Sequence, residues 1–340
     1  MEGAFKITDS PNRKDWSDFV YNHPHGNIFQ TPEMAEVYKR TKNYEPITLA
    51  ALDDNNRIIA FLQAVLIKEG GILGPFSSRS IIHGGPLFVE GEEGTKAFKM
   101  LIEYYDRIMR KKAIYTEIRN IWNTSGVLDI FKERGYELHD HLNFIINLNR
   151  VPEEIFSGFA RDKRRNIKKA AKHGVNLRIA NKMEEIGSFY EILLETYRKA
   201  KLPLADKTLF FSAFNVLCKV GKARVFLAEV KGDIIAGRFI LCHKTVIYDW
   251  YAGAKRNYLL YHPNEFLVWC VFKWGSENGF HIFDFGGAGD PRREYGVREF
   301  KRGFGGTMVN FGRYRKIHAP LKLWLAERGF EIYRKIRWRK

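Results

Sequence analysis

The feature that most constrains the fold of this chain is a weak internal repeat. Residues 48–67 (TLAALDDNNRIIAFLQAVLI) resemble residues 225–241 (VFLAEVKGDIIAGRFIL). Each stretch has two apolar runs around a polar turn, a pattern that predicts a β-hairpin. A repeat of this length, found twice in one chain, predicts two similar structural units that follow one another in the sequence.

The repeat continues after the hairpins. Three more blocks match in the same order: a helix that leads into a strand (97–118 and 265–285), a short helix (128–136 and 298–304) and a final strand (143–148 and 307–312). Chance similarity between amphipathic patterns is the alternative explanation, but it accounts poorly for the shared order. We therefore expect helix, hairpin, strand, helix, strand, helix, strand to occur twice.

A proline marks the junction between the two copies. Pro152 follows the strand that ends the first copy, and a helical pattern begins directly after it. We expect a first unit over residues 1–150, a second over 151–318 and a C-terminal helix over 319–340.

Composition places the chain among globular proteins of a reducing compartment. Its 340 residues are 45% hydrophobic, enough for sizeable cores, and no apolar run reaches the ~18 residues of a membrane span. The N-terminus lacks the apolar core of a secretory signal. The three cysteines are odd in number and widely spaced, which argues against a disulfide framework. We expect a cytoplasmic protein, and the sequence leaves its oligomeric state open.

The net charge of +17 is concentrated in two segments. Residues 161–178 carry +7 and residues 313–340 carry +8, so the rest of the chain is nearly neutral. Clustered positive charge attracts phosphates, nucleic acid or anionic lipid. The alternative is a solvated surface that keeps the protein soluble.

Both basic segments have a helical pattern. In the first, Arg161, Arg165 and Lys168 lie off the apolar face and Lys163 falls on it; all four are candidates to bind an acidic substrate. The second begins at Pro320 and forms an apolar stripe with a basic opposite face. The residues of that stripe are Leu321, Trp324, Leu325, Ile332 and Ile336. The stripe either packs back onto the protein, which we favour, or lies on a membrane surface.

Residues 281–306 (HIFDFGGAGDPRREYGVREFKRGFGG) contain the strongest candidates for chemistry. A strand opens into Gly286 and Gly287, which let a backbone approach a ligand closely. Lys301 follows in a glycine-rich, aromatic setting, where its positive charge could stabilise a negative oxygen. Arg302 is second choice for that role. Asp284 could accept a proton or orient an amine, and a structural acid at a strand end is the alternative.

Two residues of an earlier strand complete the candidate set. Asp249 and Tyr251 alternate along residues 248–251 and should share one face of the sheet. They could line the site, and ordinary strand packing is the alternative. No serine or cysteine has a nucleophile-elbow context, and the histidines show no HExxH spacing. We therefore expect neither a covalent acyl-enzyme nor a metal.

At this point the residues resemble a known family, the Fem-type (FemAB/FemX) aminoacyltransferases, over nearly the whole chain. Three stretches carry the resemblance: Phe29-Gln30-Thr31-Pro32-Glu33, the basic run from Arg164 to Val175, and Phe283-Asp284-Phe285-Gly286-Gly287 with Phe300-Lys301-Arg302-Gly303-Phe304. The resemblance implies an α/β (α+β) fold of two tandem GNAT-like units. Each unit would be a mixed, mostly antiparallel sheet flanked by helices, and the basic helix would follow them.

The resemblance also implies an activity. Family members move an amino acid from aminoacyl-tRNA onto an amine of a nucleotide-linked or lipid-linked cell-wall precursor, without a further cofactor. The lysine that matches Lys301 is placed near the reacting carbonyl, and Phe304 belongs to the same motif.

The chain departs from the family near its N-terminus. Met34 replaces a tryptophan, and the expected lysine falls near Tyr38, beside Lys39. Lys39 is the candidate for contact with substrate at this place in the chain.

Two other functions remain open. An acyl-CoA-dependent N-acyltransferase acting on a polysaccharide or peptide amine would hold the pyrophosphate of CoA on a glycine-rich turn. The corresponding turn here, residues 254–263 (AKRNYLLYHP), has no glycine. A non-catalytic module that binds RNA or a membrane surface is the third possibility, because a fold alone does not establish activity.

Overall fold

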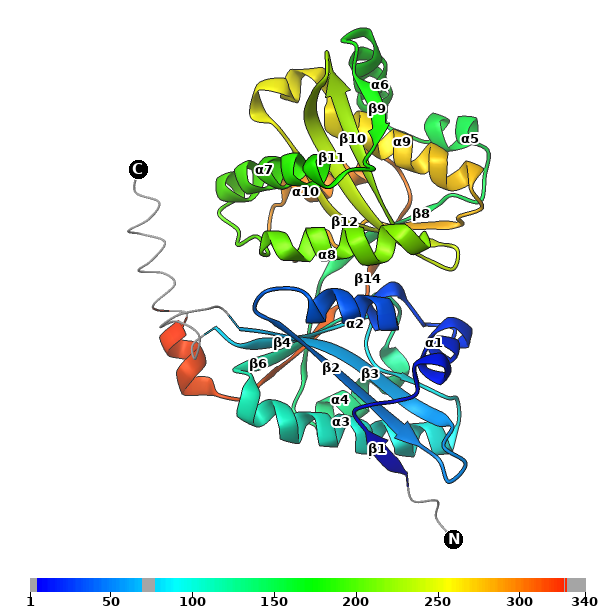
Figure 1. Ribbon diagram of the computed structural model, residues 1–340, viewed down its shortest axis with the longest axis vertical. Coiled ribbons are helices and arrows are strands. Elements are labelled where there is room, and N and C mark those ends of the chain that lie inside the picture. The colour runs from blue at the N-terminus through cyan, green and yellow to red at the C-terminus, as the bar shows by residue number, and fades with distance from the viewer. Residues whose placement is uncertain (1–4, 69–76, 327, 329–340) are drawn as a thin grey trace. The chain divides into compact units, whose positions relative to one another are not determined.

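A computed structural model describes residues 5–68, 77–326 and 328 of the chain (Figure 1). The chain forms two compact units, each built on a sheet of its own. The first unit contains the described residues up to Asp140 and those from Phe311 onward, and the second contains His141–Asn310.

The sheet of the first unit is mixed. Strands β4 and β6 are parallel to each other, and the other neighbours are antiparallel. The strands in sheet order are β1 (Lys6–Thr8), β2 (Tyr44–Leu52), β3 (Ile58–Ile67), β4 (Arg79–His83), β6 (Tyr115–Arg119), β15 (Arg313–Ile317) and β7 (Glu137–His139), with β5 (Leu87–Phe88) beside β3.

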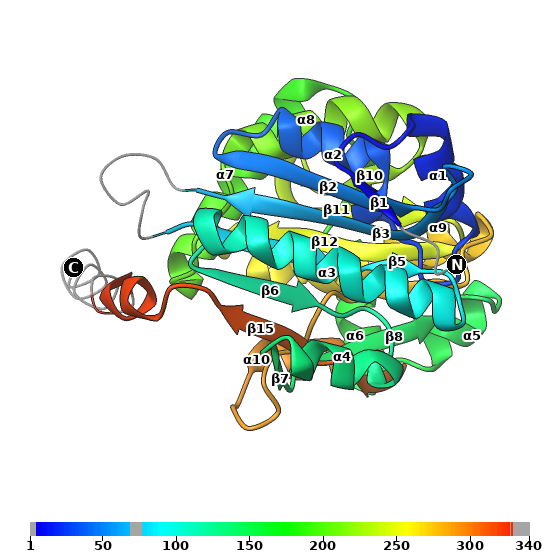
Figure 2. The same ribbon diagram turned by 90° about the horizontal axis from the view of Figure 1, so that it is seen from below.

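Helices cover both faces of this sheet. The helical segments are α1 (Arg13–Asn22), η1 (Ile28–Gln30), α2 (Pro32–Lys39), α3 (Glu92–Lys112), η3 (Ser125–Val127) and α4 (Leu128–Glu133). Helix α3 runs along one face (Figure 2), where Phe98, Leu101 and Tyr105 are fully buried at helical spacing. Helix α2 begins at Pro32 and is capped by the Thr31 hydroxyl.

The sheet of the second unit is also mixed, with β12 and β13 as its parallel pair. In sheet order its strands are β14 (Thr307–Asn310), β8 (Leu142–Asn147), β13 (Ile282–Asp284), β12 (Val246–Ala254), β11 (Asp233–His243), β10 (Ala223–Val230) and β9 (Asn176–Ile179). The parallel pairing covers only three residues and ends at Tyr248 and Asp284. Strand β12 continues for six residues beyond that point.

Helices also pack on this second sheet. They are α5 (Pro152–Ser157), α6 (Arg161–Lys172), α7 (Met183–Ala200), α8 (Lys207–Leu217), η4 (Cys218–Val220), η5 (Arg256–Tyr261), α9 (Pro263–Glu277) and α10 (Gly296–Arg302). Helix α7 packs so closely that a Cβ at Gly237 would lie 2.3 Å from the Phe189 ring. The aromatic and aliphatic side chains of α9 join the main core with Ile240 and Ile247.

The repeated order predicted from the sequence is confirmed. The predicted hairpins are β2–β3 and β10–β11, and the helices that lead into strands are α3–β6 and α9–β13. The predicted short helices are α4 in the first unit and α10 in the second. Together the two mixed sheets and their helices form the expected α/β architecture.

The predicted division of the chain differs from the observed one at both ends of the second unit. We expected β8 to close the first unit, but it pairs with β13 and β14 in the second sheet. Conversely β15 returns to the first sheet, where it pairs with β6 and β7. The second unit therefore spans His141–Asn310 rather than 151–318. The sequence of a strand reports its burial but not which sheet it joins.

The predicted C-terminal helix lies partly outside the described residues. Its described part is helical over residues 320–326. Leu321, Trp324 and Leu325 are 72%, 54% and 43% exposed, so for these residues our preferred expectation of packing against the protein was wrong. Ile332 and Ile336 lie outside the described residues. No helix within the described part of the chain combines the length and apolar character of a membrane span.

Candidate functional site

Side chains bind both the N–H groups and the carbonyl oxygens of the glycine loop after β13. Gly286 and Gly287 have positive φ angles of 74° and 120°, which favour glycine. The carboxylate of Asp284 accepts hydrogen bonds from the Gly286 N–H and from the Asn143 amide, both at 2.7 Å. The side-chain oxygen Oδ1 of Asn143 in turn accepts from the Gly287 N–H at 2.9 Å. These two glycine N–H groups are thus used within the loop, so this backbone offers carbonyl oxygens toward Lys301.

Lys301 reaches the carbonyl oxygens of this loop from α10. Its Nζ donates to Phe285 O at 2.6 Å and to Gly287 O at 2.5 Å, and it lies 5.5 Å from the centre of the Phe285 ring. The residue is only 9% exposed. An ammonium group has three N–H donors, and these contacts occupy two of them.

Burial changes the ionisation of both candidate catalytic groups. It lowers the pKa of Lys301 to about 8, with Asp249 and Asp284 opposing that shift and Arg238 adding to it. Burial raises the pKa of Asp284 to about 6, against its hydrogen bonds from Asn143 and Gly286 and the charge of Lys301. The site therefore combines a lysine that is easier to deprotonate with a carboxyl that is easier to protonate, as catalytic sites often do.

An ion pair between β11 and β12 lies near this lysine. Arg238 binds the Oδ2 of Asp249, and the two side chains are 4% and 8% exposed. A β-bulge interrupts the pairing here, so that Asp249 lies opposite Ile240 and Tyr251 opposite Phe239. Because neighbouring residues of β11 face opposite sides, Asp249 and Tyr251 do not share a face, contrary to our expectation. Tyr251 instead contacts the Phe210 ring of α8, at 4.7 Å between ring centres.

Two predicted residues of α10 and its end do not converge on the loop. The Arg302 side chain is 54% exposed and pairs with Glu299 at 3.3 Å. Phe304 is 2% exposed and belongs to the main core, with its ring 5.2 Å from that of Phe159. Phe304 thus fixes the end of α10 in the core rather than lining an accessible surface.

The basic helix α6 separates into an exposed and a buried part. Arg161, Arg165 and Lys168 are exposed, as a surface for acidic ligands requires. Lys163 is only 9% exposed, as its predicted place on the apolar face of the helix implies. Its Nζ lies 4.4 Å from the centre of the Phe300 ring and 3.6 Å from Glu265 of α9. Lys163 therefore ties α6 to α9 and α10.

The remaining predicted residue belongs to the first unit. Lys39 is the last residue of α2 and is exposed, whereas Met34 and Tyr38 are buried in the core.

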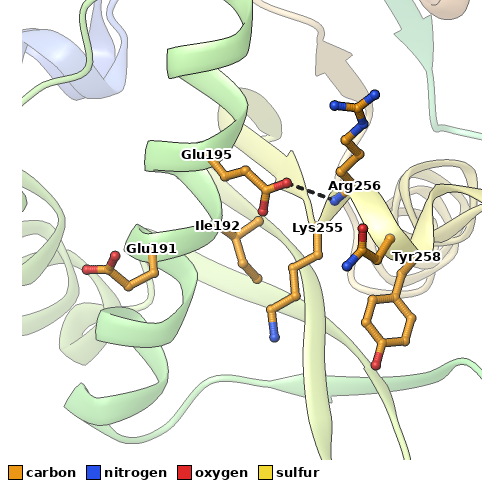
Figure 3. A pocket seen from close by; sticks show the side chains of 7 residues that line it. Glu191, Ile192, Glu195, Lys255, Arg256 and Tyr258 are labelled. Atoms are coloured by element: carbon orange, nitrogen blue, oxygen red, sulfur yellow. Dashed lines mark hydrogen bonds between the residues drawn. The ribbon is translucent and has the colours of Figure 1, made fainter. Parts of the chain in front are cut away.

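The turn that would correspond to a CoA pyrophosphate site borders a cavity of about 180 Å³ (Figure 3). It is lined by Glu191, Ile192 and Glu195 of α7 and by Lys255, Arg256, Asn257 and Tyr258. Glu195 accepts the backbone N–H of Arg256 at 3.1 Å, and the guanidinium of Arg256 extends away from Glu195. One backbone N–H of the turn is thus already bound to a carboxylate, and two carboxylates line the cavity, which disfavours a pyrophosphate there.

Other chemistries find little support among the described residues. They contain no cluster of three or more His, Cys, Asp or Glu side chains able to hold a metal ion. All three cysteines are free, and burial raises the pKa of each thiol to about 12. A thiol with so high a pKa is a poor nucleophile at neutral pH.

The sequence analysis missed two residues that shape the site, Asn143 and Arg238. Arg238 stands alone in the apolar run IIAGRFILC, and such an isolated charge in a buried strand is a signal for a buried ion pair. Asn143 had no comparable signal, because β8 was assigned to the other unit.

Comparisons with known proteins agree with this arrangement. Residues 157–302 match the Acetyltransferase (GNAT) domain family. A lipid II:glycine glycyltransferase of Staphylococcus haemolyticus is 19% identical, with 84% of this chain and 87% of that protein covered. The crystal structure of FemX superposes with a TM-score of 0.72 at 17% identity, covering 94% of this chain and all of FemX. A tandem GNAT protein from the clavulanic acid biosynthesis pathway superposes with a TM-score of 0.60 at 10% identity. This superposition covers 94% of this chain and 99% of that protein.

The GNAT match lies within the unit that holds Lys301 and Asp284, and the FemX likeness extends over both units. The chain is therefore a Fem-type aminoacyltransferase built from two GNAT-like units.

Proposed function

We propose that this enzyme transfers an aminoacyl group from aminoacyl-tRNA to an amine of a peptidoglycan precursor that is linked to a lipid or a nucleotide. The carrying observation is Lys301, a buried ammonium group held by two backbone carbonyls at the end of a glycine loop. The relative named lipid II:glycine glycyltransferase supports this class of acceptor. The aminoacyl-tRNA donor is inferred from the family.

In the proposed reaction the acceptor amine attacks the carbonyl carbon of the aminoacyl ester. The third N–H of Lys301 stabilises the oxyanion, an effect worth about 3–4 kcal/mol for one well-placed donor. Asp284 takes a proton from the attacking nitrogen. The new C–N bond forms, the C–O ester bond breaks, and the proton passes to the departing ribose oxygen. Binding both substrates in the right orientation supplies much of the remaining acceleration.

Basic surface residues supply the proposed contact with RNA. Arg161, Arg165 and Lys168 project from α6 and would neutralise phosphates of the donor. Replacing Arg165 and Lys168 by alanine should weaken tRNA binding and flatten its dependence on salt. An affinity of the unmodified protein that stays constant between low and physiological salt would contradict this contact.

The exposed segment at the C-terminus supplies a proposed contact with the cytoplasmic face of the membrane. Leu321, Trp324 and Leu325 present apolar surface beside basic side chains, as interfacial helices do. We expect the protein to bind vesicles that contain anionic phospholipid. Replacing Trp324 and Leu325 by serine should reduce that binding and leave transfer to a water-soluble acceptor unchanged.

The decisive experiment offers the purified enzyme two donors in parallel, radiolabelled aminoacyl-tRNA and acetyl-CoA, each with a lipid-linked or nucleotide-linked precursor. We expect an amide product, identified by mass spectrometry, only with the tRNA donor. Product from acetyl-CoA alone would establish the acyl-CoA-dependent alternative, which the carboxylates near residues 255–258 disfavour. Substrate binding without any product would establish a non-catalytic binding module.

A further inference from the structure

One buried oxygen atom beside Lys301 has no role in the mechanism above. The side chain of Asp249 is 8% exposed, and its Oδ2 pairs with Arg238. Its Oδ1 is buried and has no hydrogen-bond partner among the described residues. Leaving a charged acceptor unmatched in a protein interior costs about 1–3 kcal/mol or more. An unmatched carboxylate oxygen at this position therefore points to a cationic or hydrogen-bond-donating ligand.

The position of Asp249 fits a ligand of the reaction site. It is the first residue of β12 beyond the last parallel pair, Tyr248 with Asp284, so it lies where the two strands part. The glycine loop packs directly on it, since a Cβ at Gly286 would come within 2.8 Å of Asp249 O. Among nearby charges, its carboxylate has the largest effect on Lys301. Asp249 and Lys301 thus belong to one electrostatic cluster.

We propose that the free oxygen of Asp249 binds the α-ammonium group of the aminoacyl donor while Lys301 faces the carbonyl oxygen of the same group. The inference rests on the proposed function and adds the residue that selects an aminoacyl over a simple acyl donor. An aminoacyl ester carries a positive nitrogen one carbon away from its carbonyl, whereas an acetyl group has none. Arg238 holds the other oxygen of Asp249 and so fixes the direction of the carboxylate.

Binding of this kind also protects the donor. A protonated α-amine has no lone pair, so one donor cannot attack the ester of another. The positive charge next to the carbonyl carbon makes that carbon more electrophilic as well. The proposed contact would thus serve both selection and orientation of the donor, before the acceptor amine attacks.

The first test needs no variant. The unmodified enzyme is given glycyl-tRNA and Nα-acetylglycyl-tRNA, which differ in the charge and size of the nitrogen substituent. A hydrogen bond to a charged group contributes about 1.5–3 kcal/mol, so we expect kcat/KM to be about 10- to 150-fold higher for glycyl-tRNA. Equal rates with the two donors would overturn the inference and leave the proposed function intact. Transfer from neither of these donors, nor from any other aminoacyl-tRNA, would overturn both.

The second test separates charge from the size of the acetyl group. Asp249→Asn keeps the shape of the side chain and should lower kcat/KM for glycyl-tRNA about 10- to 100-fold. For Nα-acetylglycyl-tRNA the same variant should stay within twofold of the unmodified enzyme, so the preference collapses. An equal loss with both donors would instead make Asp249 a support for Lys301 or a proton acceptor. No loss with either donor would mean that water alone occupies Oδ1.

Discussion

The two units contain the same Phe-Lys pair in corresponding helices, yet only one of these lysines is buried. Lys132 of α4 is exposed, whereas Lys301 of α10 is bound to two carbonyl oxygens. In the first unit, the glycine carbonyl oxygens near the end of the parallel strand pair accept hydrogen bonds from uncharged side chains. Trp122 donates to Gly84 O and Gln30 donates to Gly85 O. A neutral donor ties down a loop, but a buried ammonium group can also stabilise a developing negative charge.

The difference between the units also extends to their acids. Beside Lys301 the second unit has Asp284 and Asp249, both largely buried. At the end of the parallel pair in the first unit, the ring of His83 stacks on that of Phe29, with ring centres 4.5 Å apart. Burial and the charges of Arg119 and Arg313 lower the pKa of His83 well below its usual value, so this ring stays neutral. We infer that the second unit performs the chemistry.

The largest effect should come from exchanging the two lysines for methionine, one at a time. Lys301→Met removes the donor to the oxyanion, and we expect kcat to fall about 10²- to 10³-fold. Lys132→Met removes an exposed charge and should leave kcat within twofold. Single-turnover rates with saturating donor separate the chemical step from binding. A comparable loss in both variants would contradict the assignment of the chemistry to the second unit.

The pH dependence of kcat/KM should report the ionisation of Lys301 and Asp284. Lys301 acts in its protonated form, so activity should be lost as pH rises through about 8. Asp284 must be ionised to accept a proton, so activity should also be lost as pH falls through about 6. The expected profile is a bell whose limbs belong to the coupled groups together.

Variants at each residue should change one limb of that bell. In Asp284→Asn the acidic limb should disappear and the maximal rate should fall about tenfold or more. In Lys301→Arg the alkaline limb should move upward, because arginine keeps its charge. A profile that is the same in all three proteins would show that neither group controls the rate.

Much of this site could be predicted from local sequence. The glycines and the lysine of residues 281–306 stand close together in the chain, and a strand–loop–helix order brings them together in space. Asn143 could not be found in this way, because it meets the site through sheet pairing between distant segments. The isolated charge of Arg238 signals a buried ion pair, but its partner Asp249 is known only from the pairing of β11 with β12. The placement of β8 in the second sheet and of β15 in the first also depends on strand pairing between distant segments. The sequence of a strand fits either sheet until its neighbours are known.

Lys163 shows a different limit of sequence analysis. Helical spacing already placed it on the apolar face of α6, but its charge suggested a ligand. A long aliphatic stem and aromatic partners allow a lysine to be buried. A Cβ at Gly303 would lie 2.6 Å from Cε of Lys163, so the glycine makes room for that stem.

A moderate effect is expected when Lys163 is replaced. Lys163→Met keeps the stem but removes the charge over Phe300 and leaves Glu265 without this partner. Since α10 carries Lys301, we expect kcat to fall about three- to tenfold, with a shifted alkaline limb, because the lost cation–π contact loosens α10. Lys172→Met on the exposed side of the same helix is the matched control and should leave kcat unchanged. An unchanged pH profile in a folded Lys163→Met protein would limit Lys163 to a purely structural role.

The smallest effect should come from the corresponding contact of the first unit. Trp122→Phe removes the 2.7 Å hydrogen bond to Gly84 O and keeps a ring to stack on His25, where the ring centres are 3.9 Å apart. The free energy of unfolding should fall by about 1 kcal/mol, measured as a lower urea midpoint. Transfer rates should remain within twofold, because this donor only fixes a loop. A tenfold loss of kcat with little loss of stability would show that the first unit's glycines take part in the reaction, and the contrast between the two units would then fail.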